Sequence, residues 1–152
     1  MTMVESLRGC DNLVILMVDP AKSTGWACSD GTSGVERFDG GNIAKLPEPE
    51  RHALIADRFA RWLDAKLQAT QAGVLGVERM MTHGTAAHLL LGLRMVALLA
   101  GWRRKLLVEE VWESQWKPFA RKNTDWVKGD EADAQAMLAW WSEFRLPEVR
   151  HV

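Results

Sequence analysis

A run of six apolar residues constrains the fold of this chain more than any other feature of its sequence. Residues 13–18 read LVILMV, and Asp19 and Pro20 follow directly. A continuous apolar run of this length, without polar alternation, is typical of a strand that is buried on both faces of a sheet. A sheet buried on both faces needs helices on each side, so we expect an α/β fold.

The remaining segments alternate between strand and helix patterns. Further strands are expected at residues 24–28, 35–38, 74–77 and 105–111. Helices are expected at residues 50–70, 85–101, 113–121 and 130–144. This order predicts a single domain at residues 13–152 after a tail of residues 1–12. The domain would hold a mixed five-stranded sheet, with a three-stranded antiparallel meander plus parallel strands, flanked by helices.

Composition excludes several classes of protein. The chain of 152 residues carries a formal net charge of −1, with 47% hydrophobic and 26% charged residues, as is typical of a globular domain. No segment reaches the roughly 20 apolar residues of a membrane span, and the first residues lack the positive charge of a signal peptide. Cys10 and Cys28 form no CxxC pair, which argues against a disulfide scaffold or a zinc module. We therefore expect a cytoplasmic protein that does not bind membranes.

Two carboxylates stand at the ends of two predicted strands. Asp19 follows the first apolar run, and Glu78 follows residues 74–77. Open α/β sheets place their functional sites at the carboxyl ends of strands. Each residue alone also has an ordinary interpretation, because an Asp-Pro pair is usually a turn and a glutamate after a strand is usually solvated.

An acidic pair opens the last predicted helix. Asp130 and Asp133 are three residues apart and share a helix face, which continues through Met137, Trp140 and Phe144. This face is the expected apolar stripe, so the two aspartates extend the side that packs on the protein. Carboxylates are unfavourable there unless positive charge compensates them. The alternative is that Asp130 caps the helix and the acids after it complement the helix dipole.

Together these acids predict one cluster of hard oxygen ligands. Such ligands, without histidine or cysteine, suit Mg²⁺, with Mn²⁺ as a substitute. Two such ions can activate a water molecule and stabilise the leaving oxygen of a phosphodiester. The candidate metal-binding and catalytic residues are Asp19, Glu78, Asp130 and Asp133.

The residues around these acids resemble a known family, the RuvC-type Holliday junction resolvases, and its compact phage members in particular. Residues 18–27 (VDPAKSTGWA) look like the first-strand motif of the family, and residues 129–134 (GDEADA) look like its acidic last-helix motif. Val77-Glu78 and Trp116-Lys117 continue the match between them. The resemblance implies an RNase H-like fold, a homodimer and metal-dependent nicking of branched DNA, with the four acids as metal ligands.

Two departures from the family pattern leave alternatives open. Ala21 stands where the family commonly has glycine, and only about a dozen residues separate Trp116 from Asp130, where the family usually has a basic helix. In a second alignment, residues 128–144 are that basic helix and the acidic helix would follow Val152. The chain would then be a fragment, or an inactive module that binds branched DNA. Actin-like phosphotransferases begin with a similar strand-Asp-turn-strand, but 152 residues are too few for their two lobes.

A locally basic segment is the candidate DNA-binding surface. Residues 94–128 hold eight Lys or Arg against four Asp or Glu, a local balance of +4. Basic side chains supply sequence-independent phosphate contacts, and the interleaved tryptophans either stack on unpaired bases or belong to the core. We expect Trp112 to be a core residue and Lys117, Arg121 and Lys122 to contact DNA. The resemblance adds the residues that follow Glu78, namely Arg79, Met80 and Met81, as expected junction contacts.

Overall fold

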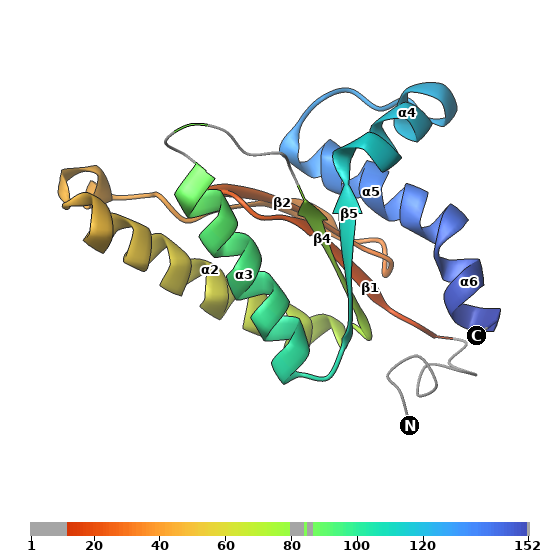
Figure 1. Ribbon diagram of the computed structural model, residues 1–152, viewed down its shortest axis with the longest axis horizontal. Helices are drawn as coiled ribbons and strands as arrows, with labels where there is room; N and C mark the ends of the chain where they lie inside the picture. The colour runs from red at the N-terminus through yellow and green to blue at the C-terminus, as the bar shows by residue number, and fades with distance from the viewer. Residues whose placement is uncertain (1–11, 80–83, 85–86, 152) are drawn as a thin grey trace.

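The computed structural model describes residues 12–79, 84 and 87–151, and these contain a mixed sheet of five strands (Figure 1). The strand order across the sheet is β3-β2-β1-β4-β5. Strands β1, β2 and β3 form an antiparallel meander, β4 runs parallel to β1, and β5 runs parallel to β4. The expected sheet is therefore confirmed. The strands are β1 (Ile15–Asp19), β2 (Ser23–Cys28), β3 (Ser33–Arg37), β4 (Val74–Arg79) and β5 (Leu107–Trp112).

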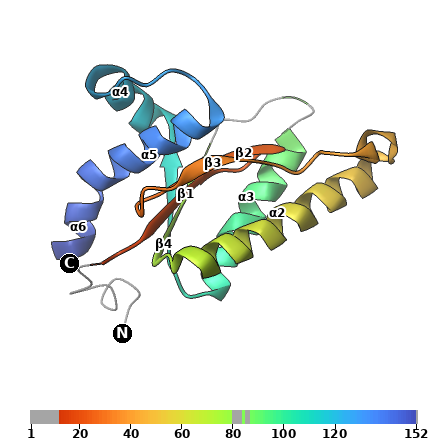
Figure 2. The ribbon, with the colours of Figure 1, turned by 180° about the vertical axis from the view of Figure 1, so that it is seen from behind.

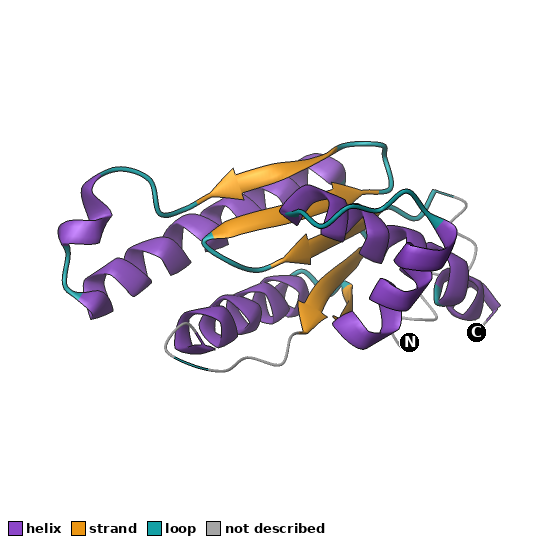
Figure 3. Cartoon of the chain, turned by 90° about the horizontal axis from the view of Figure 1, so that it is seen from above, coloured by secondary structure: helices purple, strands orange, loops and turns teal. Residues whose placement is uncertain are grey.

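Helices cover both faces of this sheet, as Figures 2 and 3 show. One layer holds the 3-10 turn η1 (Asn42–Lys45) with the long helices α2 (Glu48–Thr70) and α3 (Ala87–Arg103). The opposite layer holds α4 (Glu113–Asn123), α5 (Asp130–Phe144) and α6 (Leu146–His151).

Strand β1 lies at the centre and contributes to both cores. Leu16 and Val18 pack with α2 and α3, whereas Ile15 and Met17 pack with α4 and α5. Successive side chains of a strand point to opposite faces, so an all-apolar strand packs against the helices on both sides of the sheet. This is the physical reason for the uninterrupted apolar run.

Helix α3 is the most apolar helix, and it is apolar on more than one face. Its buried side includes Leu89, Leu93 and Ala97, which pack on the sheet. Its outer side also carries large apolar residues, including Met95 at 56% exposure and Trp102 at 70% exposure. No helix in the described ranges is long and apolar enough to cross a lipid bilayer.

Helix α5 packs on the sheet with a different face from the one expected. The buried positions are Ala134, Ala136, Met137 and Trp141, whereas Trp140 is partly exposed and Phe144 is 50% exposed. The predicted stripe was therefore wrong beyond Met137. Two adjacent tryptophans are equally apolar, so their sequence pattern does not show which of them turns inward. In the structure, Trp141 is the one that is buried, and it packs in the core cluster with residues of α4 and the sheet.

Three smaller differences separate the expected elements from the observed ones. Helix α3 extends to Arg103 and β5 begins only at Leu107, because Lys105 adopts a left-handed conformation with φ of 56° between them. The short elements η1 and α6 were not expected from the sequence. Trp112 is partly exposed, against expectation, whereas Trp116 is fully buried.

Candidate active site

Strands β1 and β4 bring Asp19 and Glu78 together. Val18 is paired with Val77 in the parallel register, so the next residue of each strand stands at the same carboxyl edge of the sheet. Glu78 is buried, with 5% of its surface exposed, and Asp19 is partly exposed. The two carboxyl groups lie close enough for each to shift the pKa of the other. Strand-end placement therefore produces a contact between two acids that are 59 positions apart in the sequence.

Burial makes the ionised forms of these two groups unfavourable. Desolvation is the largest cause, and it raises the pKa of Asp19 to about 7 and the pKa of Glu78 to about 9. The charge of Asp133 adds to the rise in the pKa of both groups, and Asp130 adds to that of Asp19. Lys117 acts in the opposite direction and lowers both pKa values. The pair therefore retains a proton near neutral pH when no cation compensates its charge.

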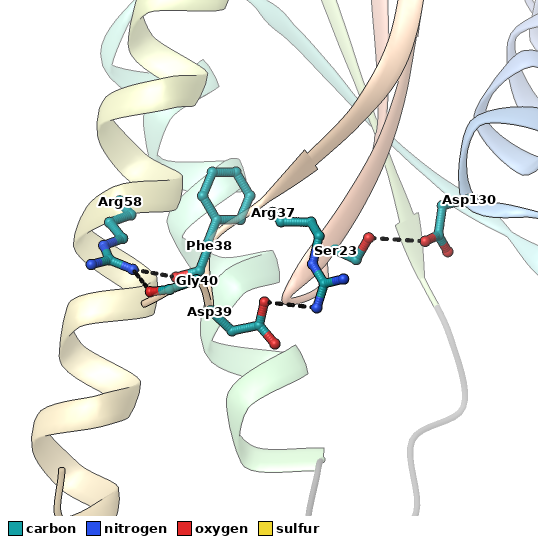
Figure 4. Close-up of polar contacts among 7 residues, drawn as sticks. All are labelled: Ser23, Arg37, Phe38, Asp39, Gly40, Arg58 and Asp130. Carbon is teal, nitrogen blue, oxygen red and sulfur yellow. Dashed lines mark hydrogen bonds and ion pairs between the residues drawn. The ribbon is translucent and has the colours of Figure 1, made fainter. Parts of the chain in front are cut away.

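The acidic start of α5 lies at the same edge because this helix approaches β2 very closely. A Cβ atom added at Gly25 would lie 1.8 Å from the backbone oxygen of Asp130, so only glycine permits the approach. The hydroxyl of Ser23 donates a hydrogen bond to Oδ2 of Asp130 over 3.1 Å (Figure 4). Gly25 is paired with Asp19 across β2 and β1, so the start of α5 lies beside the end of β1.

Asp133 is held by a residue that the sequence did not single out for this role. The indole Nε1 of Trp126 donates a hydrogen bond to Oδ1 of Asp133 over 2.9 Å. The backbone N–H of Gly129 approaches the same oxygen at 3.4 Å. No sequence signal identifies Trp126, because the contact depends on the path of the chain between α4 and α5. A role for Ser23 was also not predicted from the sequence. Its position four residues after Asp19 could have indicated that it lies near the acids.

The four acids interact electrostatically but do not form one tight group. Among the residues that the structure describes, no three His, Cys, Asp or Glu side chains are close enough together to hold a metal ion. Asp130 and Asp133 are each hydrogen-bonded to a neighbour instead. Glu78 nevertheless has a buried oxygen, Oε2, with no hydrogen-bond partner. An all-oxygen set with a buried, unpartnered carboxylate oxygen fits the ligand chemistry of Mg²⁺ or Mn²⁺.

The basic residues expected to contact DNA fall into two groups. Lys117 forms an ion pair with Glu113 and lies close enough to Asp19 and Glu78 to lower both pKa values. Arg121 and Lys122 are exposed in the last turn of α4.

Arg79 has partners within the protein. It forms an ion pair with Glu110 over 3.1 Å, and its guanidinium lies 4.4 Å from the ring centroid of Trp112. Glu110 also forms an ion pair with Arg94 of α3, with 3.7 Å between Arg94 Nε and Glu110 Oε1, so it pairs with two arginines. Met80 and Met81 lie outside the described residues.

The strand order β3-β2-β1-β4-β5, with helices on both faces, is that of an RNase H-like fold. No family model matches the sequence, and no curated protein sequence is found similar to it.

Similar solved structures include two of RuvC and one of a Holliday junction resolvase. Thermus thermophilus RuvC in complex with a Holliday junction substrate has a TM-score of 0.65 at 14% identity, over 88% of this chain and 97% of that chain. Thermus thermophilus RuvC in a second structure has a TM-score of 0.61 at 15% identity, over 86% and 96% of the two chains. The yeast mitochondrial Holliday junction resolvase Ydc2 has a TM-score of 0.56 at 13% identity, over 98% and 88%. The chain therefore has the RuvC-type fold.

Proposed function

We propose that this protein is a divalent-metal-dependent endodeoxyribonuclease that nicks Holliday junctions or other branched DNA. The observation that carries the proposal is the contact between Asp19 and Glu78 at the ends of two neighbouring parallel strands, with the charge of Asp133 acting on both. The neighbours support the choice of substrate, because one was solved with a Holliday junction and another is a Holliday junction resolvase.

In this proposal Asp19, Glu78, Asp130 and Asp133 hold Mg²⁺, for which Mn²⁺ substitutes. Bound there, the cation would supply an activated water molecule and stabilise charge on the leaving oxygen of the phosphodiester. Asp19 is the central ligand, because it lies next to Glu78 and its pKa is raised by the charges of both α5 acids, Asp130 and Asp133. Trp126 and Ser23 orient Asp133 and Asp130 through their hydrogen bonds.

The basic residues next to the acids have distinct roles. Lys117 offsets negative charge where a phosphate would approach the carboxylates, and Glu113 holds its ammonium in place. Arg121 and Lys122 contact phosphates further along the strand, since both are exposed on the same turn of α4.

The outer side of α3 supports a homodimer. Large exposed apolar residues recur there every three or four positions, at Leu91, Met95, Leu99 and Trp102. Met95, Leu99 and Trp102 line a hollow of about 530 Å³ that reaches Val108 on the edge strand β5, and all of its lining residues are apolar. A two-fold interface places the same apolar patch of two copies face to face, so a second copy of this chain is the proposed occupant.

A second candidate function is binding of branched DNA without cleavage. The observation in its favour is that no three acidic or other ligand side chains in the described ranges are close enough to hold a metal ion. Such a module would use the same basic residues and lack hydrolysis.

A nicking assay on labelled four-way junctions, with Mg²⁺ and separately with Mn²⁺, distinguishes the two functions. The nuclease proposal expects cleavage by the wild type, none by Asp19→Asn, and junction binding by both. Asp57→Asn is the matched control, because Asp57 is exposed on α2 and pairs with Arg61. If Asp19→Asn cleaves at the wild-type rate, or the wild type binds without cleaving under either ion, the nuclease proposal is wrong.

A further inference from the structure

A hollow of about 380 Å³ lies beside the acidic edge, between the ends of β4 and β5 and the outer face of α4. We call it the Trp112 pocket. Arg79 and Trp112 line it from the strands, and Ser114, Lys117, Pro118 and Arg121 line it from α4. Ser114, Lys117 and Arg121 are three or four positions apart, so they share one face of the helix.

Positive charge predominates in this pocket. Three of its lining residues are cationic, and the single anionic one, Glu113, is paired with Lys117. Arg79 is balanced by Glu110, which does not line the pocket. Arg121 forms no ion pair with any residue that the structure describes, and its side chain is exposed. The pocket therefore favours an anionic ligand.

One lining residue of the pocket, Trp112, is aromatic. Trp112 is partly exposed, and the guanidinium of Arg79 lies 4.4 Å from its ring centroid. Indole rings and guanidinium planes are the surfaces on which proteins stack single nucleobases. A volume of about 380 Å³ also lies in the range of small-molecule sites, large enough for one nucleotide.

We propose that the Trp112 pocket holds one unpaired nucleotide of the DNA strand that is cut. Lys117 lines the pocket and also acts on Asp19 and Glu78, so a nucleotide bound here has its phosphate near the acids. Arg79 directly follows Glu78 in β4. The inference rests on the proposed function and adds a preference, because a fully paired strand offers no unstacked base without an unpairing cost.

The test compares two four-way junctions that differ only by one unpaired 2-aminopurine nucleotide at the branch point. Binding is measured in EDTA by fluorescence anisotropy, so that no cleavage occurs. The wild type is expected to bind the junction with the unpaired base about tenfold more tightly, which is the range measured for stacking of one base. It is also expected to quench the 2-aminopurine fluorescence.

Trp112→Leu removes the stacking surface without removing the cap of α4, because the hydrogen bond to Gln115 Oε1 comes from the backbone N–H of Trp112. We expect this variant to bind both junctions equally and to leave the fluorescence unquenched. Trp140→Leu is the matched control, since Trp140 is partly exposed on α5 and does not line the pocket. Circular dichroism checks the fold of each variant.

Arg121→Ala tests the charge of the pocket separately. It should reduce the slope of log Kd against log salt concentration by about 0.9, the loss of one phosphate contact. Arg61→Ala on α2, in the opposite helical layer, should leave the slope unchanged.

The outcomes distinguish this inference from the proposed function. If the wild type binds neither junction, the proposed function is wrong. If it binds both equally, or if Trp112→Leu and Trp140→Leu behave alike, junction binding stands and the nucleotide pocket is overturned.

Discussion

The indole Nε1 of Trp126 donates a hydrogen bond to Oδ1 of Asp133 over 2.9 Å. The Trp126 ring itself packs edge-on against the buried ring of Trp116, with centroids 5.6 Å apart. An aromatic pair thus orients one oxygen of an acid whose charge acts on both Asp19 and Glu78. In the proposed nuclease, Trp126 is a positioning residue for Asp133.

Trp126→Phe is expected to weaken Mn²⁺ binding while leaving the fold intact. Phenylalanine keeps the aromatic contact with Trp116 but removes the N–H, and loss of such supporting hydrogen bonds typically weakens metal binding about tenfold or more. Isothermal titration calorimetry measures the affinity, and thermal unfolding measures the stability. Trp141→Phe is the matched control, because the indole N–H of Trp141 is buried without a hydrogen-bond partner. Equal Mn²⁺ affinities for the two variants would contradict the positioning role.

The stability of the metal-free protein is expected to fall as the pH rises. The folded state holds protons on Asp19 and Glu78 up to about pH 7 and about pH 9, whereas the unfolded chain releases them near the ordinary values of 3.8 and 4.5. Between these limits the folded state binds more protons, so the free energy of unfolding decreases with pH. Glu78→Gln removes the contribution of Glu78 to this effect and should stabilise the protein at pH 9 by on the order of 1–3 kcal/mol.

Urea unfolding in EDTA at pH 5 and pH 9 measures this difference. Glu143→Gln on the exposed side of α5 serves as the control for loss of one negative charge. The expectation fails if the Glu78→Gln variant gains no more stability at pH 9 than at pH 5.

Gly25→Ala is expected to displace the start of α5 from the sheet. The added methyl would lie 1.8 Å from the backbone oxygen of Asp130, and neither backbone can yield without moving an element. We expect destabilisation of about 1–3 kcal/mol or more, with loss of nicking. Gly40→Ala is the control, since a Cβ there meets nothing within 4 Å. Unfolding curves and the nicking assay together measure the effect, and wild-type behaviour of Gly25→Ala would show that the close approach is not required.

Leu99→Glu is expected to convert a dimer into a folded monomer. The substitution places a charge within the apolar patch on α3, where Leu99 is 43% exposed. Light scattering coupled to size-exclusion chromatography gives the mass directly. Phe144→Glu, at a residue that is 50% exposed on α5, should leave the mass unchanged. If the wild-type protein is monomeric at all concentrations tested, the proposed dimer interface on α3 is wrong.

The parts of the fold that the sequence predicts are those set by local patterns. The apolar run before Asp19 indicates a doubly buried strand, and the four-residue spacing of Ile55, Phe59, Leu63 and Leu67 indicates the buried side of α2. The contact between Asp19 and Glu78 follows from a general rule about strand ends, because both residues end parallel strands of one sheet.

The parts that the sequence does not predict depend on register and on loop paths. Glu110 faces Arg79 only because β4 and β5 pair with Arg79 opposite Trp112. Trp126 reaches Asp133 only because the segment between α4 and α5 returns toward the helix. Side-chain pattern along one element carries no information about either relationship.

In the proposed nuclease, acids from two strands and one helix form a single cation site. Crystals of the wild-type protein grown with Mn²⁺, with anomalous diffraction collected at the manganese edge, show where the ion binds. We expect an anomalous peak contacted by Asp19, Glu78 and at least one of the α5 aspartates, and no such peak in Asp19→Asn crystals. The proposed cation site is wrong if Mn²⁺ occupies another part of the chain instead, or if no peak lies at Asp19 under saturating Mn²⁺.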